Sequence, residues 1–260
     1  SIWGLVTDGF YTTDDFDYNP ATSVYTLKTG VVTNNGIIGT VMPGSIKFAD
    51  LNGDGRIDLD NDRKIIGNPN PRVYGGLNQQ MTYKNWDFSL FVNFAMGNDV
   101  YNANKIEFTN GYSNNSNMLD IMKDRWKVVT EDGQTALWIS NNQAVGIAPD
   151  QLNALNANAK LWQPLKSSGA FYPHSWAIED GSYLRINNLT LGYSLPLKSI
   201  SGMHMSRLRF YFTANNLAVF TKYTGYDPEV NVRNNPLTPG LDYSAYPKSR
   251  TFIFGINASF

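Results

Sequence analysis

The 260-residue sequence contains no cysteine and only two histidines, His174 and His204. The lack of cysteine excludes disulfide scaffolds, thiolate metal sites and cysteine nucleophiles. Two histidines so far apart in the sequence offer little material for a zinc site or a catalytic triad. Charge is also sparse, since the net charge is -1 and no basic cluster occurs. The sequence therefore gives no electrostatic reason to expect binding to nucleic acid.

Long apolar segments are missing as well. No run of 18 apolar residues occurs, which excludes a transmembrane helix. The chain opens SIWGLVTDGF, without a basic or an apolar leader segment, so we expect a stretch from the middle of a protein and no secretory signal here. Aromatic residues make up 13% and charged residues only 17%. This composition favours many strands with polar loops.

What the sequence does contain is regular alternation. In 251–260, Phe252, Phe254, Ile256, Ala258 and Phe260 would share one face of a strand, and the other face is polar apart from one isoleucine. The same reading predicts five strands, at about 73–83, 86–97, 183–195, 207–217 and 250–260. Lys84 and Asn85 predict a tight hairpin turn. A β-bulge near Asn187 and Asn188 would reconcile two phases of alternation in the third strand.

The connections between these strands alternate between short and long. Outer-membrane barrels have short periplasmic turns and long extracellular loops. Counting back from the last strand places turns 84–85 and 196–206 in the periplasm, and 1–72, 98–182 and 218–249 outside. A soluble β-sandwich would also show alternation, but a connection as long as 98–182 is unusual in a compact domain. The pattern favours a transmembrane barrel.

Five strands cannot close a barrel, because open edges in hydrocarbon leave unpaired backbone groups that cost several kcal/mol each. The fold class expected is therefore all-β: the C-terminal strands of a large antiparallel transmembrane β-barrel with long extracellular loops, or one member of a multi-chain barrel. The inner face of a large barrel is polar. The residues expected to face the lumen are Asp87, Asn93, Thr190, Arg209, Tyr211 and Asn257.

The sharpest local motif is DLNGDGRIDLDND at 50–62. Its oxygen-bearing residues and Gly55 follow the spacing of an EF-hand or dockerin calcium loop, although Asn61 stands where a bidentate carboxylate belongs. The candidate metal ligands are Asp50, Asn52, Asp54, Arg56, Asp58 and Asp62. The alternative is a polar loop in which the aspartates only satisfy backbone groups. We expect Ca²⁺ or a similar ion, with a role in stiffening an external loop.

Several phrases resemble one family, the SusC/RagA-type TonB-dependent outer-membrane transporters of Bacteroidota. They occur along nearly the whole chain: IWGLVTDGFY, PGSIKFADLNGDGRID, NDRKIIGNPNPRVYGGLN, NWDFSLFVNFAMGNDVYN, EDGSYLRINNLTLGYSLP, LRFYFTANNLAVFTKYTGYDPEVN and TFIFGINASF. The resemblance concerns the C-terminal quarter or so of such a protein.

The resemblance implies a barrel of 22 strands with an N-terminal plug, energised by TonB and capped by a SusD-like lipoprotein. It implies import of oligosaccharides or peptides across the outer membrane of a Gram-negative bacterium. The plug and the TonB box lie outside this sequence, and Phe260 is the expected barrel-assembly signal.

Two other functions remain open. The barrel could serve a structural or assembly role without transport, or the chain could be a soluble, calcium-stabilised carbohydrate-binding β domain. An enzyme is not expected, because no nucleophile or acid–base pair is assembled by the motifs. Five loop aromatics could stack on sugars but are expected rather to pack the loops: Trp162, Tyr172, Trp176, Tyr223 and Tyr226.

Overall fold

The structure is a computed structural model that describes residues 1–109, 117–164, 172–200, 202, 204–230 and 239–260. The chain forms two compact units. The first unit comprises residues 1–67 and 102–178, and the second comprises 68–101 and 179–260. The segments 1–72 and 98–182, expected as separate external loops, thus contribute most of their length to one folded body, which the sequence analysis did not anticipate.

Parts of the expected loops 98–182 and 218–249 lie outside the described residues, namely 110–116, 165–171 and 231–238. Within the described ranges, no helix is long and apolar enough to span a membrane.

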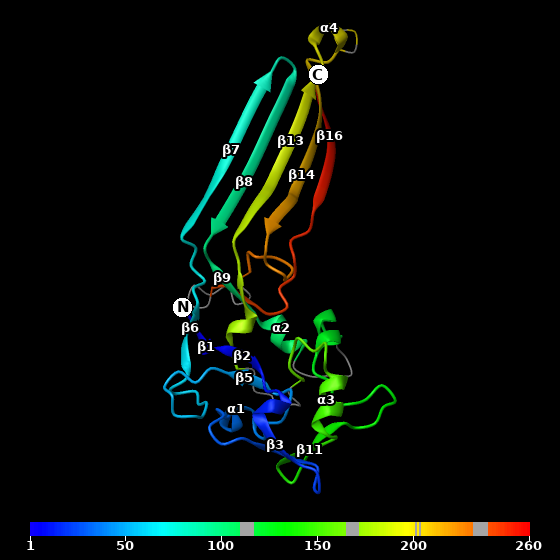
Figure 1. The fold of residues 1–260 in the computed structure, drawn as a ribbon. Helices are drawn as coiled ribbons and strands as arrows, with labels where there is room; N and C mark the ends of the chain where they lie inside the picture. The colour runs from blue at the N-terminus through cyan, green and yellow to red at the C-terminus, as the bar shows by residue number, and fades with distance from the viewer. Residues whose placement is uncertain (110–116, 165–171, 201, 203, 231–238) are drawn as a thin grey trace. The chain divides into compact units, whose positions relative to one another are not determined.

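The second unit is built on a five-stranded antiparallel sheet with the strand order β16-β14-β13-β8-β7 (Figure 1). The strands are β7 (Val73–Tyr83), β8 (Trp86–Met96), β13 (Tyr183–Ser194), β14 (Arg207–Thr221) and β16 (Thr251–Ser259). The sheet is open. Among the described residues, neither β7 nor β16 has a second neighbouring strand.

Local sequence explains how these strands pair. Tyr83 pairs with Trp86 across a two-residue turn, and Lys84 takes a positive φ of 53° there. The register of β13 shifts between Ile186 and Asn188 against both of its neighbours. The predicted hairpin turn and the predicted bulge are therefore both present. The bulge keeps the apolar residues on either side of it on one face of the sheet.

The two faces of the sheet differ in chemistry. One face carries aromatic and aliphatic side chains from all five strands, and many of these are exposed: Leu77, Met81, Trp86, Phe210, Phe252, Phe254 and Ile256. Phe254 is 80% exposed. The opposite face carries polar and charged side chains. An apolar face this large without a covering layer is unusual for a protein surrounded by water.

The second unit contains smaller elements as well. Strands β12 (Ile178–Asp180), β9 (Asp99–Asn102) and β15 (Leu241–Asp242) form a three-stranded sheet, and α4 spans Leu197–Ile200. Val100, Tyr223 and Val230 make a small buried cluster. This cluster fixes part of the segment that follows β14.

Three small sheets lie in the first unit. Two are two-stranded: β1 (Ile2–Leu5) with β6 (Arg63–Gly67), and β2 (Thr7–Phe10) with β5 (Ile46–Phe48). The third has the order β10-β11-β4-β3, with β10 (Leu137–Ser140), β11 (Gln143–Gly146), β4 (Val24–Leu27) and β3 (Phe16–Asn19).

Short helices complete the first unit. The α-helices are α1 (Asn35–Ile38), α2 (Ala103–Glu107) and α3 (Pro149–Leu155), and the 3-10 segments are η1 (Thr13–Asp15), η2 (Asp120–Asp124) and η3 (Ser175–Ala177).

Two hydrophobic cores hold the first unit together. One gathers Tyr11, Phe16, Tyr25, Trp126 and Leu152, and the other is built around buried side chains that include Leu5, Ile46, Ile57 and Trp162. Each fully buried side chain of this size contributes roughly 1.5–3 kcal/mol. The Trp126 ring lies against Gly44, where φ is 82° and a β-carbon would collide with the indole. These cores make the first unit a folded body.

Candidate functional site

The six residues expected to face the lumen all project from the polar face of the five-stranded sheet. Register places Asp87, Gly192, Tyr211 and Gly255 in one cross-strand row. Arg209 and Asn257 pair in the row beside it, and Thr190 and Asn93 fall on the same side because side chains alternate along a strand. One face thus unites residues from four strands.

The centre of this face is an ion pair that spans strand β13. Arg209 Nε donates to Asp87 Oδ1 at 2.8 Å and Arg209 Nη2 donates to Oδ2 at 2.5 Å, which is a bidentate arrangement. Gly192 lies between the two, and a β-carbon there would collide with both side chains. The Arg209 guanidinium also lies 5.1 Å from the Tyr211 ring centre, and that ring covers Gly255.

The other predicted lumen residues join smaller networks. Thr190 Oγ1 lies 2.9 Å from Thr213 Oγ1. Asn93 Oδ1 accepts a hydrogen bond from Asn187 Nδ2 at 2.6 Å, and Asn93 Nδ2 donates to Glu229 Oε1 at 3.2 Å. The polar groups of this face are therefore largely bonded to each other.

Sequence reasoning missed a buried arginine in the second unit. Arg185 is 1% exposed. Its Nη2 lies 2.6 Å from Asp227 Oδ1, its Nε lies 2.7 Å from Glu229 Oε2, and its Nη1 donates to Asn216 Oδ1 at 2.5 Å. Glu229 is not a solvated loop charge, because it is paired with Arg185 and its side chain is only 21% exposed. Two features of the sequence could have indicated this cluster. Arg185 lies within a strand of alternating residues, and Asp227 and Glu229 follow later in the chain.

Glu229 connects this cluster to a second cation. Lys248 Nζ lies 2.7 Å from Glu229 Oε2, and Tyr183 donates its hydroxyl to Oε1 at 2.7 Å. Burial by itself raises the pKa of this carboxyl, but the hydrogen bonds from Lys248 and Tyr183 and the charges of Lys248 and Arg185 outweigh it and hold the pKa below its usual range. Glu229 is thus held as an anion between two cations.

The Asp-rich loop has a regular set of internal hydrogen bonds. Asp50 accepts from the backbone N–H groups of Gly53 and Gly55, and Asp58 accepts from those of Asp60 and Asn61. Asp62 is fully buried. Its two carboxylate oxygens accept from the backbone N–H groups of Leu51 and Asp58, which closes the loop.

The remaining candidate ligands are bonded within the same loop. Asp54 accepts from Arg56 N at 3.0 Å and from Asn52 Nδ2 at 3.0 Å. Those hydrogen bonds hold the pKa of the Asp54 carboxyl below its ordinary value. In the part of the chain that the structure describes, no three acidic or histidine side chains are grouped to hold a metal ion. Calcium binding by this loop stays a prediction.

Most of the loop aromatics pack against the protein. Trp162 and Tyr223 are buried, and Tyr172 and Trp176 pack against the core that contains Trp162. Tyr226 differs, because it is 75% exposed. The expectation of packing is confirmed for four of the five aromatics, and Tyr226 is the one with a free ring.

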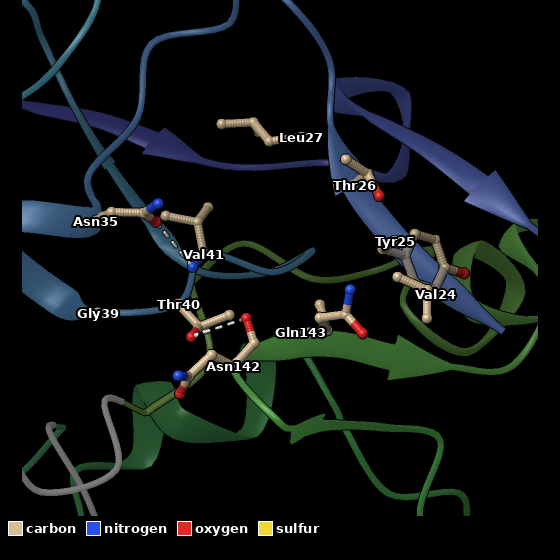
Figure 2. Close-up of a pocket in the computed structure, with 11 residues that line it drawn as sticks. Val24, Tyr25, Thr26, Leu27, Asn35, Gly39, Thr40, Val41, Asn142 and Gln143 are labelled. Atoms are coloured by element: carbon tan, nitrogen blue, oxygen red, sulfur yellow. Dashed lines mark hydrogen bonds between the residues drawn. The ribbon is translucent and has the colours of Figure 1, made fainter. Parts of the chain in front are cut away.

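The first unit also contains a cleft of about 570 Å³ between β4, the segment after α1 and the start of β11 (Figure 2). Uncharged residues line it, among them Thr26, Thr40, Asn142 and Gln143. Sequence analysis gave no indication of this cleft, because one part of its lining, 142–144, lies about a hundred residues from the other parts, 24–27 and 35–41.

Comparisons with curated proteins identify relatives. No protein-family model matches the chain. The chain is 32% identical to TonB-dependent receptor P3 of Formosa agariphila over 223 residues, which cover 84% of this chain and 19% of that receptor. It is 29% identical to TonB-dependent receptor SusC of Bacteroides thetaiotaomicron over 221 residues, which cover 82% of this chain and 17% of SusC. The chain spans about a fifth of the length of these relatives.

Solved structures with the same fold include the RagAB peptide transporter. The match covers 100% of this chain and 23% of the transporter chain, with a TM-score of 0.61 and 20% sequence identity. The RagAB peptide importer in its closed-closed state matches with a TM-score of 0.57. At this level of identity the match establishes a shared fold.

Proposed function

From its homology with TonB-dependent receptors of the SusC/RagA type, we propose that this chain forms part of an importer that moves oligosaccharides or peptides across the outer membrane. Receptors of this family are outer-membrane proteins of Bacteroidota, and they are transporters and not enzymes. The whole receptor would consist of this chain and about three and a half times as much sequence besides.

The observation that carries the proposal is the two-faced open sheet of the second unit. Its strands β7, β8, β13, β14 and β16 have the length needed to cross a bilayer at a tilt. One face exposes aromatic and aliphatic side chains that lipid would cover, and the other face holds paired charges suited to a polar lumen. Further strands from the rest of the receptor would pair with β7 and β16 and remove the open edges.

In this arrangement Asp87, Asn93, Thr190, Arg209, Tyr211 and Asn257 face the lumen, and Phe260 serves as the barrel-assembly signal. The ion pair of Asp87 with Arg209 supports this orientation, because two charges facing hydrocarbon would cost several kcal/mol. The first unit then lies outside the membrane, where its hydrophobic cores need no support from lipid.

We infer the cargo and the partner from the relatives. Solved structures that share this fold include those of the RagAB peptide transporter, and this likeness supports a SusD-like lipoprotein partner and peptide cargo. Relation to SusC leaves oligosaccharides as the other cargo class. Energy would come from TonB through the remaining part of the receptor.

Ca²⁺ remains the proposed ligand of the loop at 50–62. The set proposed is Asp50, Asn52, Asp54, Arg56, Asp58 and Asp62. The side-chain oxygens of the aspartates and of Asn52, and the main-chain carbonyl of Arg56, are of the chemical type that Ca²⁺ prefers. Asp50 and Asp58 already accept backbone N–H groups, and the remaining lone pairs of their carboxylates could bind the ion as well.

The first experiment is a heat-modifiability gel on outer membranes, probed with an antibody against 241–260. We expect a band far above the 29.1 kDa of this chain that shifts on boiling, because folded barrels resist detergent until heated. A soluble band near 29.1 kDa that ignores heating would contradict the barrel and favour the soluble carbohydrate-binding domain.

A second experiment separates import from a purely structural role. Uptake of labelled peptides and oligosaccharides would be compared between cells with the receptor, cells without it, and cells without TonB. Uptake that needs both proteins supports import. Equal uptake in all three strains, with the receptor present in the membrane, would favour the barrel as an assembly scaffold.

A further inference from the structure

The cleft of the first unit lies beside an open stretch of sheet edge. β4 pairs with β3 along its whole length, but with β11 only at Val24 and Tyr25. Continued past Tyr25, this register would place Thr26 opposite Gln143 and Leu27 opposite Asn142. Asn142 already belongs to the turn between β10 and β11, where φ is 60°. β11 begins at Gln143, one residue after Asn142, so it does not pair with Leu27.

Hydrogen bonding shows where the backbone of Leu27 points. Lys28 N donates to Asp15 O at 3.0 Å, on the β3 side, and Gly146 N donates to Ser23 O at 2.9 Å, on the β11 side. Backbone groups alternate in direction along a strand, so Leu27 directs its N–H and C=O away from β3 and toward the cleft. No hydrogen bond within the described residues occupies them on that side.

Side-chain amides surround this backbone pair. The amides of Asn142 and Gln143 make no hydrogen bond to another described residue, and the amide of Asn35 uses only its oxygen, which accepts from Val41 N at 3.3 Å. In Figure 2, Asn35 lies toward the left of the view and Gln143 toward the right, and Asn142 lies beside Thr40, which donates to its backbone oxygen. The cleft thus offers donors and acceptors but no charge.

We propose that this cleft binds an uncharged, extended peptide segment, which adds to the edge of β4 at Leu27 as a short extra strand. Backbone pairing at a sheet edge is a recurrent mode of peptide recognition, and the volume of about 570 Å³ suits a few residues. The proposal does not depend on import through the barrel, because the site lies wholly within the first unit.

The chemistry of the walls favours a peptide over a sugar. Sugars are commonly held by an exposed aromatic ring face. Among the described residues that line the cleft, the one aromatic is Tyr25, which is 3% exposed and donates its hydroxyl to Ile147 O at 2.6 Å. The exposed polar groups are instead amides and hydroxyls, which match the donors and acceptors of a peptide backbone.

The test uses the full-length receptor in detergent and a photoreactive probe, acetyl-Thr-Val-Thr-Val amide with a benzophenone at its C-terminus. Crosslinked residues are mapped by mass spectrometry. We expect saturable crosslinks to 24–27, 39–41 and 142–144. A probe of the same sequence with N-methylated backbone nitrogens should lose at least about tenfold in crosslinking there, because it cannot donate to the strand edge.

Matched variants test the side-chain contribution. Asn142→Gly removes an amide that lines the cleft, whereas Asn141→Gly removes its neighbour in the same turn, and glycine tolerates the positive φ at both positions. We expect binding to weaken about three- to tenfold in Asn142→Gly, as for the loss of one hydrogen bond, and to stay within about twofold in Asn141→Gly.

Three results would overturn the proposal. They are equal crosslinking by the N-methylated probe, competition by maltotetraose but not by the unlabelled peptide, and crosslinks that map only outside the cleft residues. The last result would leave peptide import untouched, since a transport site in the lumen would give such crosslinks. Loss of import with cleft crosslinking retained would contradict the proposed function alone.

Discussion

Asp87 and Arg209 form a bidentate ion pair across β13, and the strand between them carries glycine where their side chains meet. The two residues are 122 positions apart in the sequence. Three strands must be in correct register before this pair can form, so the pair reports on sheet assembly. Gly192 is needed here for space: any side chain would occupy the volume that the ion pair fills.

We predict that Gly192→Ala destabilises the sheet by about 1–3 kcal/mol, because the added methyl group forces the Asp87–Arg209 pair apart or shifts the backbone. Gly202→Ala is the matched control, since a β-carbon there meets nothing within 4 Å. The measurement is the temperature at which the full-length receptor loses its heat-modifiable form on gels. Equal transition temperatures for both variants would show that the pair does not constrain the sheet.

The Arg185 cluster gives a second prediction. Arg185→Met leaves Asp227 and Glu229 without their buried cation, which we expect to cost about 3–5 kcal/mol and to open the segment that follows β14. Faster hydrogen exchange at 222–230 would report this opening. Lys248→Met removes the exposed partner of Glu229 and should cost less than about 1 kcal/mol. If both variants exchange alike, burial of Arg185 is not what holds the segment.

The sheet was accessible to sequence reasoning because its signal is local. Alternation repeats every two residues, so the strand at 251–259 and the hairpin at Lys84 could be located from neighbouring residues alone. The bulge at Asn187 was also visible, as a change of phase within one strand. In each case the apolar residues had to share a face, and only one register satisfies that condition.

The fold of the first unit could not be predicted from the sequence, because it depends on contacts between residues far apart in the chain. Its strands are three to five residues long, which is too short for alternation to stand out from composition. Partners such as Tyr25 and Ala144 lie more than a hundred residues apart. The same distance hid the Arg185 cluster, whose acids come from the segment after β14. The sequence shows that Arg185, Asp227 and Glu229 are charged, but it does not show that they form ion pairs with one another.

A third prediction concerns Ca²⁺ binding by the loop at 50–62. We predict that adding millimolar Ca²⁺ slows proteolysis of this loop in the purified receptor, because a bound ion would cross-link its carboxylates. Asp58→Asn should abolish the effect, whereas Asp132→Asn, in a different turn, should retain it. Equal proteolysis with Ca²⁺ and with a chelator would establish the alternative, in which backbone N–H groups alone satisfy Asp50, Asp58 and Asp62.

The last prediction concerns pH and His174. This side chain is 6% exposed, its Nδ1 lies 2.8 Å from Thr7 Oγ1, and the rings of Phe48, Trp162 and Trp176 surround it. Burial, assisted by the charge of Lys105, lowers the pKa of His174 from 6.5 to about 4. The unfolded chain therefore takes up a proton below pH 6.5 while the folded chain stays neutral until about pH 4.

The sign follows directly: the contribution of His174 is fully present above pH 6.5 and is lost as the pH falls toward 4, by roughly 3 kcal/mol in all. The protection factor for hydrogen exchange at 172–178, which corrects for the intrinsic pH dependence of exchange, should fall over that window. His174→Gln cannot take up the proton, so its protection factor should change less with pH even though the variant packs less well. His204→Gln, at an exposed position, should keep the wild-type profile. A wild-type profile in His174→Gln would mean that another group drives the acid sensitivity of the first unit.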